Sequence, residues 1–477
     1  MFNKINKIIE YLLYLLVFLL PLQTRWIIKL GNMEYSTYSL YWTDIILVFI
    51  LLLFIILKLS TYPLPTTNYQ LPAWRLIFGL VLISAVSVFF SSDKLLALYK
   101  FSWLILGVGL FWLIISANYN RLKLIYVFLA GIFLQAVLGI WQFLTQSTFS
   151  NKWLGLAQHN STDLGTSVIE VTKIGERWLR AYGGLDHPNM LGGLLVIGIL
   201  ILIVEIIKIN MNDKFLIFDF KFLNNIKFFK IILWLLLLIF TMALFFSFSR
   251  AAWLGLIIGL VSATTLTIFN RNLLQQKQLI KIILIMGILL FILFNQCQNL
   301  VIARISNSDR LEIKSTTERL VSYQNSWEVI KQNWFTGVGI GNYVLILRNK
   351  NFINQANYNY QPAHNTFLLI CAEVGIIGVI FFIGILIHLI ILNFFRLLNL
   401  NQSQDSDEYR ENFQYLIFKN KIKDFNIECL FNLMILFSLI ILLNFDHWWW
   451  SLHFGILFFW LIVGIIYKRL NCYFSCG

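Results

Sequence analysis

The sequence ERLVSYQNSWEVIKQNWFTGVGIGNY, at residues 318–343, decides how this chain is organised, together with QPAHNTFLLICAEVGIIG at residues 361–378. Both stretches belong to the longest polar interruption of a chain that is otherwise almost entirely apolar. Charged side chains placed at a membrane are costly and tend to be paired or functional. We therefore expect the interruption to divide a bundle of membrane helices and to carry the function.

The composition excludes a soluble protein. Hydrophobic residues make up 59% of the 477 residues and charged residues 13%, whereas about a quarter of an average soluble domain is charged. Apolar runs recur throughout, many of them close to the roughly twenty residues that cross a bilayer as a helix. The predicted fold class is all-α, a polytopic membrane protein of about 12 transmembrane helices with a large, partly helical outer loop. The predicted spans are residues 8–23, 44–58, 76–91, 101–117, 124–146, 190–207, 231–248, 251–269, 279–295, 374–395, 428–445 and 455–470.

The basic residues predict which side of the membrane each segment faces. Lys and Arg together number 37, and the net charge is +14. They concentrate in the segments that share a side with both termini, and the short loops of the opposite side hold few of them. Because Lys and Arg are enriched in cytoplasmic loops, we expect both termini inside and residues 147–189 and 296–365 outside. This anchoring role explains the positive charge better than a nucleic-acid partner does.

The polar interruption divides the chain into three parts. Residues 1–295 form a transmembrane bundle of spans 1–9, residues 296–365 a large periplasmic (outer) loop, and residues 366–477 spans 10–12. The first apolar run follows basic residues as in a signal peptide, but no small-residue cleavage site follows, so it is predicted to stay as the first span. The polar stretch at residues 401–412 is predicted to be a linker.

The large outer loop contains a predicted helix. Ser315 and Glu318 form a capping box, which predicts a helix start and places Arg319 in its first turn. Helical spacing predicts that one face packs on the membrane or on the bundle, and its residues are Leu320, Tyr323, Trp327, Ile330 and Trp334. A tight turn should end the helix at the glycines, which are Gly337, Gly339 and Gly341.

His364 is the first candidate for chemistry. It lies in PAHN, at the junction between the outer loop and the next span. A neutral imidazole accepts a proton from a hydroxyl near neutral pH, as few other side chains do. The alternative is an interfacial histidine that helps to cap the following helix beside Asn365, and the position alone leaves both interpretations open.

Several arginines stand at the outer ends of predicted spans. Arg250, in FFSFSRAAWLG, lies in a short turn with no acidic residue nearby in the sequence. Such an arginine can simply reach into the interface, but an unpaired charge at a membrane favours an anionic ligand. Arg180 and Arg319 extend the pattern, and guanidinium groups bind phosphate oxygens bidentately. Together they predict a site for a phosphorylated lipid.

The remaining polar residues give no ligand set for a metal. The five cysteines form neither a CxxC pair nor a Cys/His cluster. GVGIGN lacks the last glycine of a dinucleotide motif, because Asn342 stands there. The acidic residues of the outer loop lack the paired spacing of a metal cage or of a glycosidase, and they are Asp309, Glu312, Glu318 and Glu328. We therefore predict chemistry without a metal or a cofactor.

Asp446 and His447 precede three consecutive tryptophans at the last outer turn. Tryptophan is enriched at membrane interfaces, so the interpretation favoured by the sequence is an aromatic belt at residues 448–450. A role for Asp446 and His447 in orienting a ligand is the less favoured alternative.

Taken in order, four motifs resemble those of the O-antigen ligase family and of related polysaccharide polymerases. The resemblance covers roughly residues 180–395, and its motifs are RAYGGLDHPNMLGG, SFSRAAWLG, the helix from Arg319 to GVGIGN, and PAHNTFLLICAEVGIIG. Single motifs are loose, whereas the ordered set is fairly specific. The asparagine-rich loop NKNFINQANYNYQP departs from the pattern, and nothing in the sequence identifies a lipid A core as the acceptor.

The resemblance implies a metal-independent membrane glycosyltransferase of the bacterial inner (plasma) membrane. Its donor would be a glycan linked to polyprenyl pyrophosphate, and its acceptor a hydroxyl of a glycan, lipid or protein. The implied catalytic residues are His364, Arg319 and Arg250. The substrate-binding candidates are Arg180, Arg250, Arg319 and Asn365.

Other activities stay open at this point. A polysaccharide polymerase and a protein O-oligosaccharyltransferase share the family motifs. A transporter of an anionic or polar solute is the alternative of another class, but transporters favour binding sites near the membrane centre and repeated halves. A non-catalytic scaffold in envelope assembly is also compatible with the sequence.

Overall fold

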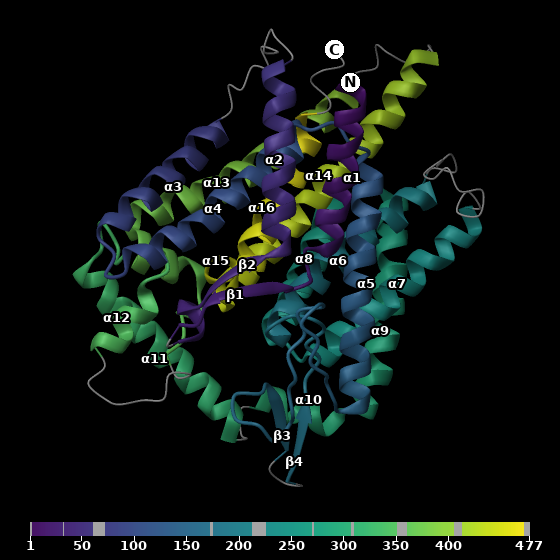
Figure 1. The fold of residues 1–477 in the computed structure, drawn as a ribbon. Helices are drawn as coiled ribbons and strands as arrows, with labels where there is room; N and C mark the ends of the chain where they lie inside the picture. The colour runs from purple at the N-terminus through teal and green to yellow at the C-terminus, as the bar shows by residue number, and fades with distance from the viewer. Residues whose placement is uncertain are drawn as a thin grey trace.

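The computed structural model describes residues 2–31, 33–60, 72–171, 175–211, 226–269, 271–306, 310–350, 360–404 and 413–471. Helices dominate the structure (Figure 1). They are α1 (Phe2–Leu19), α2 (Trp42–Ser60), α3 (Pro72–Phe89), α4 (Lys94–Ser116), α5 (Arg121–Thr145), α6 (Pro188–Met211), α7 (Ile226–Ser247), α8 (Arg250–Phe269), α9 (Leu273–Gln296), α10 (Gln298–Ser306), α11 (Arg310–Gln332), α12 (Tyr343–Lys350), α13 (Thr366–Gln404), α14 (Phe413–Phe445), α15 (Trp448–Ser451) and α16 (His453–Asn471). Two antiparallel hairpins pair β1 (Arg25–Lys29) with β2 (Tyr38–Tyr41) and β3 (Val168–Val171) with β4 (Glu176–Leu179), and the short 3-10 helix η1 (Glu34–Ser36) lies within the first.

The prediction of an all-α polytopic membrane protein is confirmed. Each predicted span overlaps one helix, and nine helices of the described residues are long and apolar enough to cross a membrane. Shorter apolar stretches lie at residues 73–89 and 453–468. The sequence did not predict the two hairpins, because strands of four or five residues are too short for their alternation to stand out.

Helix α6 forms the centre of the bundle. Its most apolar window is buried along its whole length, and α5, α7, α8, α9 and α14 pack around it. A helix that is apolar on every side is stable only where other helices or lipid surround it completely. The sequence LLVIGILILIV, at residues 194–204, has that character, so it places α6 inside the protein.

A glycine turn docks into a break in α13. Gly375 has φ +82° inside this helix, and the amide of Ile376 donates to the carbonyl of Trp334 (2.8 Å). On the other side of the break, the amide of Gly339 donates to the carbonyl of Glu373 (2.9 Å). An added Cβ on Gly375 would lie 2.1 Å from the carbonyl oxygen of Phe335, and positive φ favours glycine. The predicted turn is therefore confirmed, and it fixes the end of α11 against the start of α13.

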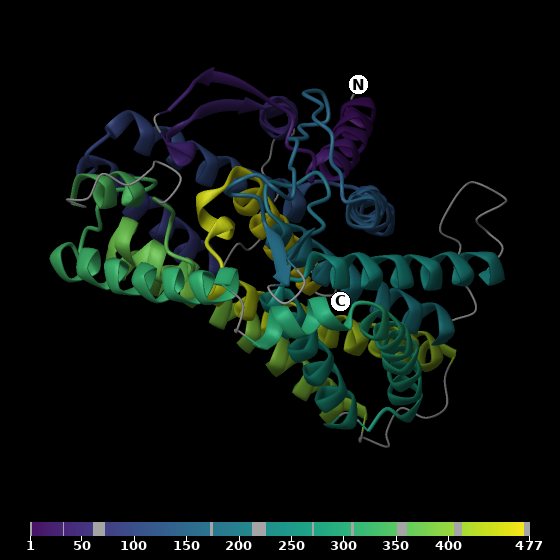
Figure 2. The same ribbon diagram turned by 90° about the horizontal axis from the view of Figure 1, so that it is seen from below.

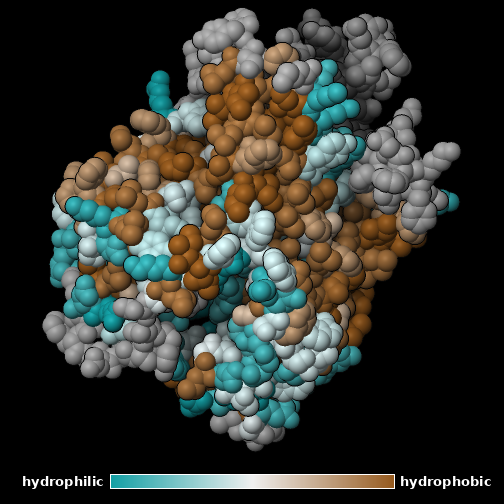
Figure 3. Space-filling model, in the orientation of Figure 1, coloured by the Kyte–Doolittle hydropathy of each residue, from teal (hydrophilic) through white to brown (hydrophobic). Residues whose placement is uncertain are grey.

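The helices between α9 and α13 lie together at one end of the bundle. Helices α10, α11 and α12 and the β3–β4 hairpin are at the end opposite the N- and C-terminal labels (Figure 1). We call this end the α11 side. Seen along the bundle, α11 crosses the spans instead of running parallel to them (Figure 2). Hydrophilic residues gather at the α11 side, hydrophobic residues cover much of the bundle above it, and the surface between them is hollowed (Figure 3).

The apolar face of α11 turns mainly away from the protein. Leu320, Trp327 and Trp334 are more than half exposed, whereas Ile330 is buried. Of the two predicted environments, the arrangement favours the membrane interface for most of this face, since tryptophan is enriched there.

The expected orientation of the protein can be tested by labelling. The exposed Thr317 in α11 and the exposed Asn118 between α4 and α5 lie at opposite ends of the bundle. In a cysteine-free background, we expect an impermeant thiol reagent to label Thr317→Cys in intact cells and Asn118→Cys only after lysis, since the Lys and Arg distribution places the α11 side outside. The reverse pattern would invert the orientation. Asn354, a natural labelling position in the same outer segment, lies outside the described residues.

Candidate functional site

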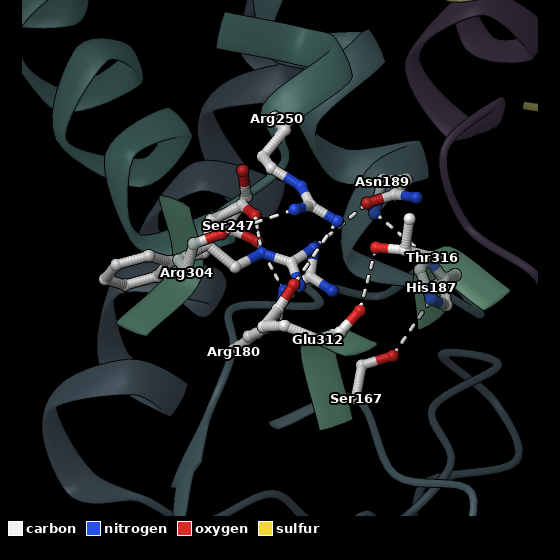
Figure 4. A network of polar contacts seen from close by, with 10 residues as sticks. Ser167, Arg180, His187, Asn189, Ser247, Arg250, Arg304, Glu312 and Thr316 are labelled. Atoms are coloured by element: carbon white, nitrogen blue, oxygen red, sulfur yellow. Dashed lines mark hydrogen bonds and ion pairs between the residues drawn. The ribbon is translucent and has the colours of Figure 1, made fainter. Parts of the chain in front are cut away.

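Three arginines from separate segments meet around one carboxylate at the α11 side (Figure 4). Arg180 follows β4, Arg250 begins α8 and Arg304 lies in α10. Glu312, in the first turn of α11, is ion-paired with Arg304, and its Oε2 lies 3.2 Å from Nη2 of Arg250. Residues far apart in the sequence thus form a dense cluster of charge.

The turn between α7 and α8 holds these arginines in place. Phe248 adopts φ +46° there. The carbonyl of Ser247 accepts from Nε of Arg180 (2.8 Å), and the carbonyl of Phe248 accepts from Nε of Arg304 (3.0 Å). The motif SFSR therefore supplies both an arginine and the backbone acceptors that orient two further arginines.

A hydrogen-bond chain connects Arg180 to Asp446. Nη2 of Arg180 donates to Oδ1 of Asn189 (2.9 Å), and Nδ2 of Asn189 donates to Oδ2 of Asp446 (2.9 Å). Oδ1 of Asp446 accepts from the amide of His447 (2.9 Å), so both carboxylate oxygens are hydrogen-bond acceptors, as an ionised carboxylate requires. Asp446 is thus an ionised carboxylate in the interior of the site.

His187 is a neutral, structural histidine. Its Nδ1 accepts from the amide of Asn189 (3.1 Å), so Nε2 carries the proton and donates to Oγ of Ser167 (2.9 Å). Burial, with a contribution from Arg180, lowers the pKa of His187 to about 3. This tautomer cannot take a proton from Ser167, which excludes a Ser–His nucleophile at this position.

His364 lies beside Asp446 and His447. The rings of His364 and His447 are 5.3 Å apart, and Nδ1 of His364 is buried without a hydrogen-bond partner among the described residues. Burial lowers the pKa of His364 below its ordinary value; the carboxylate of Asp446 opposes this effect and the charge of Arg319 adds to it. His364 is therefore a neutral imidazole at neutral pH, with a nitrogen that is not committed to the fold.

His447 is held in one tautomer. The hydroxyl of Ser451 donates to the carbonyl of His447 (3.1 Å), so it accepts from Nδ1 (2.7 Å) and leaves Nε2 unprotonated. Burial lowers the pKa of His447 to about 3.

Arg319 connects the histidines to the arginine cluster, but the prediction of its place in the helix is wrong. Helix α11 begins at Arg310, ahead of the capping box, so Arg319 lies near its middle. Its charge acts on His364 on one side and on Arg250 on the other. Among the described residues Arg319 has no hydrogen-bond or ion-pair partner, which leaves its guanidinium group available to a ligand.

Arg250 has an acidic partner, so the prediction that it is unpaired is also wrong. Glu312, which is 62 positions further along the chain (312 − 250), lies within ion-pair distance of it. Sequence proximity did not reveal this partner, because the contact depends on the packing of α11 against the α7–α8 turn.

Asn365, one of the predicted substrate-binding residues, makes two hydrogen bonds that stabilise the fold. Its Oδ1 accepts from the amide of Leu368 (3.0 Å), which caps α13, and its Nδ2 donates to the carbonyl of Asn444 (3.0 Å). Both ends of the amide thus make hydrogen bonds within the protein, and a substrate contact by Asn365 stays a prediction.

The interpretation of residues 448–450 as an aromatic belt is wrong, since Trp448, Trp449 and Trp450 are all buried within the protein. They pack α15 into the bundle, and the indole of Trp450 donates to Glu373 (2.9 Å). Their burial brings Asp446 and His447 into the site.

Sequence reasoning did not select several residues of this site, which are His187, Asn189, Arg304, Glu312, Asp446 and His447. One feature of the sequence could have indicated His187, Asp446 and His447 as site residues. An Asp–His pair directly precedes both α6 and α15, and polar pairs at the entrance of apolar helices are expensive unless they have partners.

The ligand atoms of His364, Asp446 and His447 lie within 4.8 Å of one another, an arrangement that can hold a metal ion. Two observations favour proton transfer instead. Both carboxylate oxygens of Asp446 already accept hydrogen bonds, from Asn189 and from the amide of His447 (2.9 Å). The positive charge of Arg319 also acts on His364, and it would disfavour a nearby cation.

Comparison with known proteins supplies one match. The family model described as O-antigen ligase matches residues 235–383. The matched region contains Arg250, Arg304, Glu312, Arg319 and His364, while Arg180 and Asp446 lie outside it. No curated protein matches the chain.

Proposed function

We propose a reaction for this chain from the match of residues 235–383 to the O-antigen ligase family model. This match supports a membrane glycosyltransferase of the ligase or polymerase type. The specific proposal is transfer of an oligo- or polysaccharide from polyprenyl pyrophosphate to an acceptor hydroxyl, without a metal. The observation that carries it is a continuous chain of neighbours, in which Arg180 lies near Arg250, Arg250 near Arg319, and Arg319 near His364.

The arginines are the proposed pyrophosphate site. When the bond between the anomeric carbon and the phosphate oxygen breaks, its electron pair stays on the pyrophosphate, and negative charge grows there. Fixed donors that face this charge stabilise the transition state. Arg250 and Arg319 would make this contact directly. Nε and Nη2 of Arg180 donate to Ser247 and Asn189, which fixes the guanidinium group, so Arg180 would add its charge and its remaining N–H donors to the site.

His364 is the proposed base. The acceptor hydroxyl attacks the anomeric carbon, and its proton passes to the uncommitted Nδ1 of His364. Asp446, next to His364, would stabilise the imidazolium ion that forms. The position of His364 directly before α13, whose N-terminal dipole favours negative charge, helps to keep the resting imidazole neutral.

The transporter alternative loses support. Transporters place broken helices around a binding site near the membrane centre. The break in α13 at Gly375 is instead filled by the backbone of residues 334–339. The charged residues stand at helix ends or in the segments between spans, since Arg250 begins α8, Arg304 lies in α10 and Glu312 in the first turn of α11.

The proposed setting is the bacterial inner membrane, with both termini cytoplasmic and the α11 side facing outward. The partners would be the lipid bilayer, the polyprenyl-pyrophosphate-linked glycan and a glycan, lipid or protein acceptor. Ligase, polymerase and protein O-oligosaccharyltransferase differ in that acceptor.

The direct test is a transfer assay with purified protein in liposomes. We expect a polyprenyl-pyrophosphate glycan and a suitable acceptor to yield free polyprenyl pyrophosphate and glycosylated acceptor. Separate reactions with the unglycosylated lipid core, a second donor molecule and an acceptor protein would distinguish the three activities. Failure of all three acceptors, with donor left intact, would contradict the proposal.

Metal independence gives a separate prediction. Because arginines, and not a cation, would stabilise the pyrophosphate, transfer should be unchanged by EDTA. The His364–Asp446–His447 group makes this a strict test. Loss of transfer in EDTA that a divalent ion restores would instead assign these three residues to a metal.

A further inference from the structure

We propose that Glu312 is an internal counter-ion that occupies Arg250 in the resting protein and is replaced there by the pyrophosphate of the substrate. The inference rests on the proposed function and deepens it. It concerns a residue that carries no role in the transfer chemistry itself.

The charge balance around Glu312 motivates the inference. Arg180, Arg250 and Arg304 place three guanidinium groups around a single carboxylate. Burial, followed by the charge of Arg304, lowers the pKa of buried Arg180 well below its ordinary value, and Glu312 opposes this. Such a cluster is costly without more negative charge. A pyrophosphate supplies that charge.

Glu312 binds its two arginines unequally. Its Oε1 accepts a hydrogen bond from Nη1 of Arg304, and Nε of Arg304 donates to the carbonyl of Phe248. Its Oε2 lies 3.2 Å from Arg250 but has no hydrogen-bond partner among the described residues, although it is buried. The contact with Arg250 is therefore electrostatic and poorly aligned, so it is the contact that a ligand can replace.

The two arginines also differ in accessibility. The side chain of Arg250 is 30% exposed, whereas that of Arg304 is 7% exposed. A ligand that enters from outside thus reaches Arg250 first, while Glu312 stays bound to Arg304. A pyrophosphate carries more negative charge than a carboxylate and also accepts bidentate hydrogen bonds from a guanidinium.

This exchange would serve product release. Transfer converts a pyrophosphate diester into a monoester, which gains an ionisable oxygen and binds arginines more tightly. A carboxylate that returns to Arg250 lowers the affinity for the spent carrier. Glu312 would therefore weaken binding at this site and speed turnover.

The test is binding of farnesyl pyrophosphate, a short prenyl pyrophosphate, to the purified full-length protein. In Glu312→Gln the amide oxygen still accepts from Arg304, but the charge that competes for Arg250 is gone. We expect its Kd to fall about five- to tenfold, the lower range of couplings between sites, and the turnover of the transfer reaction to fall with it. Glu312→Asp keeps the charge and should bind like the wild type.

Glu170→Gln is the matched control. It removes another carboxylate at the α11 side, one that pairs with exposed Arg310 (3.2 Å), and its Kd should not change. Equal or weaker binding by folded Glu312→Gln would show that Glu312 only positions the arginines, and would overturn the inference. Equal tightening in the Glu170 control would do the same. If the wild type binds no prenyl pyrophosphate at all, the proposed donor fails along with the inference.

Discussion

Replacement of His364 by alanine should abolish glycan transfer while the protein still inserts and binds its donor. The hydroxyl is a poor nucleophile until its proton is removed, and a positioned base contributes about a hundredfold to ten-thousandfold in rate. The arginines that we propose to hold the donor are untouched by this change. The measurement is single-turnover transfer with donor binding measured in parallel, and near-normal transfer would remove the general-base mechanism.

The pH dependence of the wild type tests the same role. A base must be neutral, so transfer should fall as the pH drops through the pKa of His364. Because burial lowers that pKa, activity should stay level from neutral pH to below about 6.5, the ordinary value for histidine, and fall only at more acidic pH. A profile without an acidic limb would leave His364 as an orienting group.

A second histidine provides the control for these experiments. His388 lies in the membrane-spanning part of α13, in the same helix that follows His364 but far along it. His388→Ala should therefore retain both transfer and the acidic limb of the profile. Loss of transfer in both variants would point to a general defect in α13.

Lysine at position 250 or 319 should lower turnover by about tenfold to a hundredfold, because each charge-assisted hydrogen bond contributes about 1.5–3 kcal/mol. Lysine keeps the charge but loses the planar fork that binds two phosphate oxygens. Arg319→Lys should show the cleaner effect, since Arg319 makes no hydrogen bond within the described protein, whereas Arg250 also contacts Glu312.

Arg310→Lys is the control for both variants. Arg310 begins α11 and pairs with Glu170 at an exposed position, where an ion pair contributes little. The turnover of Arg310→Lys should match that of the wild type. Near-normal turnover in Arg250→Lys and Arg319→Lys would reduce these residues to anchoring charges and remove the bidentate model.

The sequence predicted the membrane helices because their signal is local. A bilayer demands about twenty consecutive apolar residues for each helix, and every predicted span overlaps a helix. The glycine turn after α11 was predictable for a similar reason, since Gly337, Gly339 and Gly341 all have positive φ. The start of α11 was not, since the helix begins at Arg310, ahead of the capping box that the sequence contains.

The sequence by itself thus determined the spans and selected His364, Arg180, Arg250 and Arg319 as individual residues of interest. Only the tertiary structure decided their neighbours. Glu312 reaches Arg250, and Asp446 reaches His364, across long separations in the chain. The tertiary structure also buried Trp448–Trp450 and thereby brought Asp446 inward. Electrostatic pairing and burial depend on distance in space, which a linear pattern of residues does not contain, whereas membrane insertion depends on the local run of apolar residues, which it does.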